Sequence, residues 1–149
     1  MAFEYFEDYV PGGVYEYGSL DVTEVEMIQF ARRFDPQPIH TDPHLAARGP
    51  FVGLIASGLH TISAVMSLFV THYLTHVASL ASPGVDEVRF PIPVRPGDRL
   101  RVRVETLDSR LSRSKPDRGI VRSRIEGLNQ NGEVVLSLIA INIIGRRPA

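Results

Sequence analysis

The chain has 149 residues, a length that predicts one domain with a single hydrophobic core over residues 1–149. Its apolar content of 44%, charged content of 22% and net charge of -1 are ordinary for a soluble globular protein and give no basic excess for nucleic acid. It has no cysteine, which excludes disulfides, thiolate metal ligands and a cysteine nucleophile. The acidic N-terminus lacks the features of a signal peptide, so a cytoplasmic location is expected.

The N-terminal segment is predicted to be a docking arm followed by a strand and a helix. Residues 1–13 carry several aromatic side chains and close with a Pro-Gly-Gly turn. Weak alternation over residues 14–22 favours a strand. The helix should begin at Glu24, because Thr23 and Glu26 fit a capping box in which the Glu26 side chain reaches back to the Thr23 amide.

Two acid/base side chains, Asp35 and His40, follow this helix. Pro36 and Pro38 lie between them. Each proline lacks a backbone donor and disfavours the α conformation in the residue before it. The segment is therefore predicted to be a stiff, extended loop that presents both side chains. A short second helix should then begin with Asp42 as its N-cap.

A long apolar segment occupies residues 51–77, and within residues 59–74 the apolar side chains recur at three- and four-residue steps. Such a helix, apolar nearly all round, is typical of a buried core position. A membrane span is the alternative, since the run approaches the length that crosses a bilayer. Its glycine, serine, threonine and histidine residues, and the lack of a second span, disfavour that alternative.

The second half of the chain has the two-residue period of strands. Strands are predicted over residues 88–94, 99–105, 120–128 and 133–144, with prolines that suit an edge in the first and apolar side chains on both faces of the last. The last strand should lie inside a sheet or in a subunit contact. A long helix covered by an antiparallel sheet is an α+β plan, and a curved sheet wrapped around that helix is the hotdog fold.

Four segments are informative when taken together, namely residues 30–42, 53–58, 95–100 and 129–133. The first contains Asp35-Pro36-Gln37-Pro38-Ile39-His40, and the second ends in Ser57-Gly58. In this order and spacing they resemble the MaoC-like dehydratase family, which includes the R-specific enoyl-CoA hydratases of the hotdog superfamily. The resemblance extends over nearly the whole chain.

The resemblance implies roles for particular residues. Asp35 and His40 would jointly hold and activate a water, and the amide of Gly58 would bind the thioester carbonyl. Hydration of a 2-enoyl thioester needs these groups, because a proton must leave water, a proton must reach Cα and charge builds on the thioester oxygen. Gln37 and Ser57 stand where many family hydratases have asparagine and histidine. They are expected, with Gly58, to be oxyanion or substrate-binding residues, and the two changes should bear on substrate choice.

The expected function is hydration of a 2-enoyl-CoA or dehydration of a 3-hydroxyacyl-CoA. Two alternatives stay open: an acyl-CoA thioesterase and a non-catalytic acyl-CoA binding module. In the plainest interpretation Asp35 binds neighbouring amides and His40 is a partly buried histidine with a satisfied ring. No cofactor is expected beyond the coenzyme A of the substrate, although acyl-carrier protein could replace it. A homodimer or higher homo-oligomer is expected, with an acyl tunnel lined by the long helix and the aromatic arm.

No metal site is expected. His72 and His76 have the spacing of two zinc ligands on a helix, but Tyr73 stands where a zinc hydrolase has its glutamate. His40 and His44 are separated by the start of the second short helix. The phosphates of coenzyme A could bind basic side chains, with solvated surface charge as the alternative; the candidates are Arg99, Arg101, Arg103 and the loop 113–118.

Overall fold

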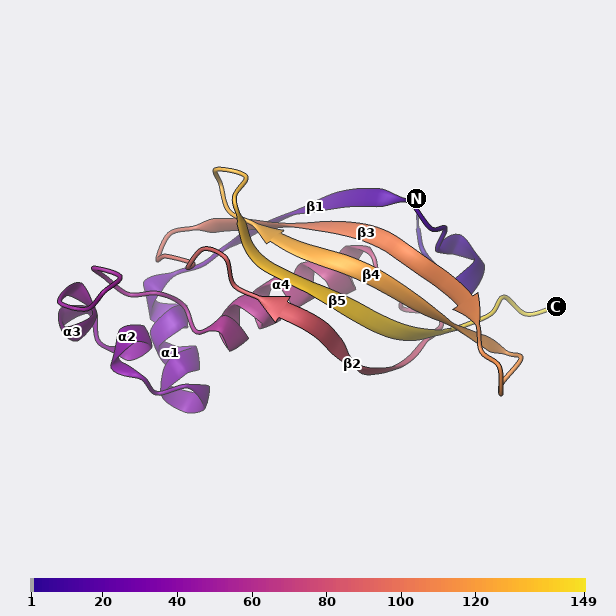
Figure 1. Ribbon diagram of the computed structural model, residues 1–149, viewed down its shortest axis with the longest axis horizontal. Coiled ribbons are helices and arrows are strands. Elements are labelled where there is room, and N and C mark those ends of the chain that lie inside the picture. Colours follow the sequence, from indigo (N-terminus) through magenta and orange to yellow (C-terminus); the bar gives the residue numbers. More distant parts are fainter. Residues whose placement is uncertain (1) are drawn as a thin grey trace.

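The computed structural model describes residues 2–149 and shows a long antiparallel sheet curved around one helix (Figure 1). The strand order is β1-β3-β4-β5-β2, and every neighbouring pair is antiparallel. This is the hotdog arrangement expected from the sequence. The elements are the 3-10 turn η1 (Phe6–Asp8), β1 (Val14–Asp21), α1 (Glu24–Phe34), α2 (Pro38–Thr41), α3 (Pro43–Ala47), α4 (Gly58–His72), β2 (Ser79–Arg89), β3 (Arg99–Leu111), β4 (Arg118–Leu128) and β5 (Val134–Gly145).

Helix α4 packs one face on the concave side of the sheet, against β1 and β3. Val65 and Phe69 are each 1% exposed on that face, whereas Leu59 and Val70 lie in solvent. The prediction that the helix is buried nearly all round was therefore wrong, because the sheet curls around only one side of it. In the described residues 2–149 no helix combines the length and the apolarity needed to cross a bilayer.

The N-terminal arm docks at the C-terminal end of α4. The Tyr9 hydroxyl donates a 2.8 Å hydrogen bond to the Tyr73 carbonyl and accepts one of 2.8 Å from the Thr75 amide. The ring of Phe3 stacks on Tyr9 at 4.7 Å. Docking of the arm is confirmed, and the arm closes the end of the core opposite the first residue of α4.

The strand predicted over residues 88–94 differs from the structure. β2 runs from Ser79 to Arg89, whereas residues 90–94 form part of the connection to β3. Prolines in that connection remove the amides that a sheet ladder requires. β2 is an edge strand, but it shares only residues 88 and 89 with the predicted strand whose prolines suited an edge. β5 is apolar on both faces and lies inside the sheet, between β4 and β2, which confirms the first of its two predicted positions.

Helix α1 begins at Glu24 as predicted, with the Thr23 hydroxyl accepting from the Glu26 amide. The Glu26 carboxylate binds the Thr23 hydroxyl at 3.0 Å, where a full capping box would have it bind the Thr23 amide. α3 also starts as expected, since the Asp42 side chain accepts from the amides of His44 and Leu45. The cap assignments were thus correct in position and wrong in one partner.

The segment from Asp35 to His40 is not extended throughout, which corrects the prediction. Pro38 opens the short helix α2, and His40 lies within it. Proline is tolerated at the first helical position, where its missing donor has no intrahelical partner to lose. The pre-proline restriction acts on Gln37, which is extended (φ -85°, ψ 139°) and serves as the N-cap. Proline here starts a helical turn rather than preventing one.

Candidate active site

Asp35 and His40 meet beside the first turn of α4. Asp35 is the C-cap of α1, and its amide donates to the Ala31 carbonyl at 2.8 Å. The turn of α2 then brings His40 back, so that its Nε2 lies 3.4 Å from Oδ2 of Asp35. The side chain of His40 is 9% exposed, and that of Asp35 is 22% exposed. The structure therefore brings together the two residues that the sequence singled out.

Two neutral donors hold the Asp35 carboxylate. Gln37 Nε2 donates to Oδ1 at 2.7 Å, and the Ser57 hydroxyl donates to Oδ2 at 2.7 Å. These hydrogen bonds, from Gln37 and then Ser57, lower the pKa of Asp35, and the neighbouring His40 adds to the effect against a smaller contribution from burial. Gln37 and Ser57, which were predicted to be oxyanion or substrate-binding residues, thus both bind the carboxylate of this pair.

The ring of His40 has a defined tautomer. Its Nδ1 lies 2.8 Å from the carbonyl oxygen of Ile55. Because a carbonyl oxygen only accepts, Nδ1 carries the proton, and in the neutral imidazole Nε2 carries the lone pair. His40 is 7% exposed, so its orientation is fixed by packing as well as by this bond. The free lone pair points to the side of the ring where Asp35 lies.

A mainly apolar cavity of about 320 Å³ opens next to the pair. It lies between the start of α4 and the connection that follows β2. His40 and Gly58 contribute to its wall, whereas the arm does not, so the predicted lining by aromatic arm residues was wrong. The lining residues are His40, Phe51, Ile55, Ala56, Gly58, Thr61, Phe90, Pro91, Ile92, Pro93, Val94 and Val135.

Gly58 is the first residue of α4 and follows the fully buried Ser57. Amides of a first helical turn lack intrahelical acceptors, and the helix dipole favours negative charge there. A Cβ on Gly58 would lie 2.6 Å from the ring of Phe90. Phe90 was not among the predicted site residues, because the alternation around it indicated a strand rather than a cavity wall.

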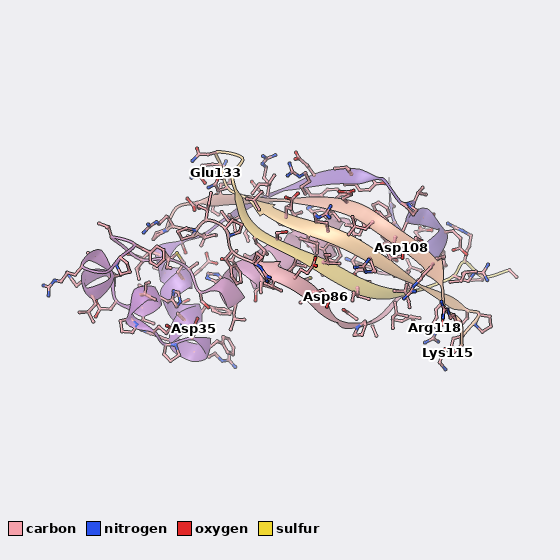
Figure 2. The ribbon with its side chains drawn as sticks, in the orientation of Figure 1. Asp35, Asp86, Asp108, Lys115, Arg118 and Glu133 are labelled. Atoms are coloured by element: carbon pink, nitrogen blue, oxygen red, sulfur yellow. The ribbon has the colours of Figure 1, made fainter. Side chains whose placement is uncertain are left out.

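The proposed phosphate-binding arginines lie elsewhere. Arg99 pairs with Asp21 at 2.9 Å, Arg101 with Glu16 at 3.2 Å, and Arg103 with Glu126 at 2.9 Å. Figure 2 shows Lys115 and Arg118, in the other candidate segment, at the opposite end of the molecule from Asp35. These arginines are better explained as surface charge, the alternative that the sequence left open.

The remaining histidines have other contacts. The ring of His72 stacks on Tyr17 at 5.0 Å, and His76 Nε2 contacts the Val70 carbonyl at 2.7 Å. Within residues 2–149 no three histidine, aspartate or glutamate side chains gather as metal ligands would.

A sheet curved around one helix, with an Asp–His pair at an apolar cavity, defines a hotdog-fold protein with acid/base groups at the helix start. The model of the MaoC-like domain matches residues 8–126 of this chain. The chain therefore belongs to the MaoC-like dehydratase family, a family of hydro-lyases, as the sequence motifs indicated.

Relatives agree in fold and in family. The crystal structure of a MaoC-like dehydratase from Rhodospirillum rubrum superposes with a TM-score of 0.89 at 38% identity, covering 97% of this chain and 99% of that one. The uncharacterized protein YdeM of Bacillus subtilis is 32% identical over 83% of this chain and 86% of its own length. The 3-hydroxyacyl-thioester dehydratase Z of Mycobacterium tuberculosis is 40% identical, but over only 54% of each chain.

Proposed function

We propose that this protein adds water to a 2-enoyl-CoA, or removes it from the 3-hydroxyacyl-CoA, with Asp35 and His40 acting on one water. The observation that supports this most directly is the 3.4 Å approach of His40 Nε2 to Asp35 Oδ2 at the edge of a cavity that also contains Gly58. One carboxylate and one imidazole within reach of the same water are the groups that general acid–base catalysis uses.

The protonation states of Asp35 and His40 fit a syn addition, in which the pair takes one proton from water and delivers the same proton to Cα. Asp35 is held as a carboxylate by Gln37 and Ser57, and in the neutral form of His40 the proton is on Nδ1, bound to Ile55. Neither group then holds a free acidic proton. The proton taken from water as its oxygen bonds to Cβ must be the one delivered to Cα as the double bond is lost. Two acceptors 3.4 Å apart can pass that proton between them.

The Gly58 amide is the proposed donor to the thioester oxygen. A preorganised donor placed where charge develops is among the larger contributions to catalysis, about 3 to 4 kcal/mol for one donor. Gly58 and His40 both line the cavity, so a thioester held by the amide would present its double bond to the pair. The apolar wall suits the acyl group, with coenzyme A as the proposed carrier and no further cofactor.

The name of dehydratase Z supports a thioester substrate, although its match covers only 54% of each chain. A panel of enoyl-CoA substrates of graded length should lose the ultraviolet absorbance of the conjugated enoyl thioester when the protein is added. Release of free thiol with the double bond intact would instead identify a thioesterase. Saturable binding with neither change would identify a binding module.

We also propose a homodimer. β2 is an edge strand whose Leu80 and Val85 are 49% and 42% exposed, and an edge presents unpaired backbone groups to a second chain. Light scattering coupled to size-exclusion chromatography should give twice the chain mass of 16.6 kDa. A monomer mass at micromolar concentration would refute the dimer.

A further inference from the structure

Arg95, in the connection between β2 and β3, reaches across to the segment that precedes α4. Its Nη2 donates to the Phe51 carbonyl at 2.6 Å, and its Nη1 lies 3.4 Å from the Leu54 carbonyl. The backbone on either side is fixed as well, since the Asp98 carboxylate accepts from the Arg95 amide at 2.9 Å. One side chain thus joins two parts of the chain that both line the cavity.

Residues 51–57 lack regular secondary structure and adopt a backbone that local propensity does not favour. Val52 has φ 52° and Gly53 has φ 145°, both in the left-handed range. A β-branched residue with positive φ persists only where surrounding contacts impose it. The two Arg95 contacts bracket these residues, at Phe51 on one side and Leu54 on the other. A Cβ on Gly53 would lie 3.4 Å from Nη1, so the guanidinium lies directly against this turn.

The same segment positions His40. Ile55, the residue after Leu54, supplies the carbonyl that accepts from His40 Nδ1 at 2.8 Å. The Ile55 amide binds the Ile39 carbonyl at 3.3 Å, and the Ala56 amide binds the Val94 carbonyl at 2.9 Å. The direction of the Ile55 carbonyl therefore depends on where Leu54 and Ala56 are held. Arg95 fixes the first through its side chain, and its neighbour Val94 fixes the second.

The requirement is specific to arginine. The planar guanidinium offers several N–H groups in a fixed fork and so reaches two carbonyls three residues apart, whereas a lysine ammonium at one point reaches one. Among residues 2–149 the ion pairs do not include Arg95, and the nearby Asp98 carboxylate is taken by the Arg95 amide and by Gln130. The hydrogen bonds of its guanidinium go to the backbone carbonyls of Phe51 and Leu54.

We propose that Arg95 is a positioning residue for the acid/base pair. By holding the carbonyls of Phe51 and Leu54 it aims the Ile55 carbonyl at His40 Nδ1, and so keeps the Nε2 lone pair directed at Asp35 and the cavity. The proposal rests on the proposed hydratase function for its kinetic consequence. Its structural consequence, the tautomer of His40, does not depend on that function.

The test compares Arg95→Gln with the matched control Arg99→Gln, which removes an exposed arginine paired with Asp21 on the outer face. The ring nitrogens of His40 are followed by ¹⁵N nuclear magnetic resonance at a pH where the imidazole is neutral. The expected result is a pure Nδ1–H tautomer in the wild type and in Arg99→Gln, and a mixture of the two tautomers in Arg95→Gln. For hydration, Arg95→Gln should lower kcat about 10- to 100-fold with KM changed by less than about threefold.

An unchanged tautomer or a wild-type kcat in Arg95→Gln would overturn the proposal. If Arg95→Gln does not fold, Arg95→Lys keeps the charge and one contact, and it is judged by the same two readouts. If the wild type is inactive on every enoyl thioester, the proposed function fails, and the tautomer comparison alone decides whether Arg95 positions His40.

Discussion

The Ser57 hydroxyl donates to Asp35 Oδ2, the same carboxylate oxygen that His40 Nε2 approaches. Ser57 is fully buried and is the N-cap of α4, yet its side chain makes no capping hydrogen bond because it is directed at Asp35 instead. The residue before the proposed oxyanion donor thus also binds the proposed base. The position of α4 and the ionisation of Asp35 are linked through this one hydroxyl.

Ser57→Ala should raise the pKa of the Asp35 carboxyl. Removing a donor to the carboxylate destabilises the charged form, so the lowered pKa of Asp35 should rise toward its ordinary value. Loss of one hydrogen bond to a charged group corresponds to a shift of about one pH unit. The measurement is the titration of the Asp35 carboxyl carbon, followed by ¹³C nuclear magnetic resonance as a function of pH.

Ser63→Ala is the control for this change, because the Ser63 hydroxyl donates to the Leu59 carbonyl on the exposed side of α4. In this variant the Asp35 carboxyl should titrate as it does in the wild type. The same Asp35 pKa in Ser57→Ala as in Ser63→Ala would show that Ser57 does not stabilise the Asp35 carboxylate.

Asp35→Asn and His40→Ala should each lower kcat by about two to four orders of magnitude, because each removes one of the groups through which the proton of water passes. The fold should survive, since Asp35 lies at a helix end and His40 in a short turn. Steady-state hydration kinetics and circular dichroism check the two expectations. Asp86→Asn, on the exposed edge strand β2 (Figure 2), and His44→Ala, in α3, are the controls and should retain activity. Near wild-type turnover in both site variants would reject the assignment.

Much of the site was predictable because it rests on local signals. The cap at Thr23, the N-cap at Asp42 and the spacing of Asp35 and His40 are short-range patterns, and each indicated the right element boundary or residue pair. The helical turn at Pro38 was missed because proline both restricts the residue before it and favours a first helical position. Sequence alone did not show which of these two effects would decide the conformation.

The rest required three-dimensional contacts. The bond from Ser57 to Asp35 joins residues 22 apart, and that from Arg95 to Phe51 joins residues 44 apart. The exposed side of α4 could not be read from its composition, because apolar residues there follow the helical period as well as those in the core do. The cavity wall at Phe90 formed where a predicted strand ended early, which only the pairing of β2 with β5 reveals.

Phe90→Ala should widen the acyl site. The Phe90 ring lines the cavity, contacts the position above Gly58 and is 47% exposed, so its removal opens the wall without emptying the core. KM for a branched or long enoyl-CoA should fall severalfold relative to KM for a short one, as expected for a change in apolar pocket volume. Phe34→Ala removes a ring that is 55% exposed outside the cavity and should leave this ratio unchanged. An unchanged ratio in Phe90→Ala would place the acyl chain elsewhere.

Tyr9→Phe should destabilise the protein without affecting catalysis. The buried Tyr9 hydroxyl bonds both the Tyr73 carbonyl and the Thr75 amide, and its removal leaves two buried backbone groups unpaired. A loss of about 1–3 kcal/mol in the free energy of unfolding is expected, measured by urea denaturation. Tyr15→Phe is the control: the Tyr15 ring lies in the same aromatic cluster, but its hydroxyl makes no hydrogen bond to residues 2–149. Equal unfolding free energies for the two variants would contradict the prediction, and kcat should stay at the wild-type value in both because the arm docks at the end of α4 opposite Gly58.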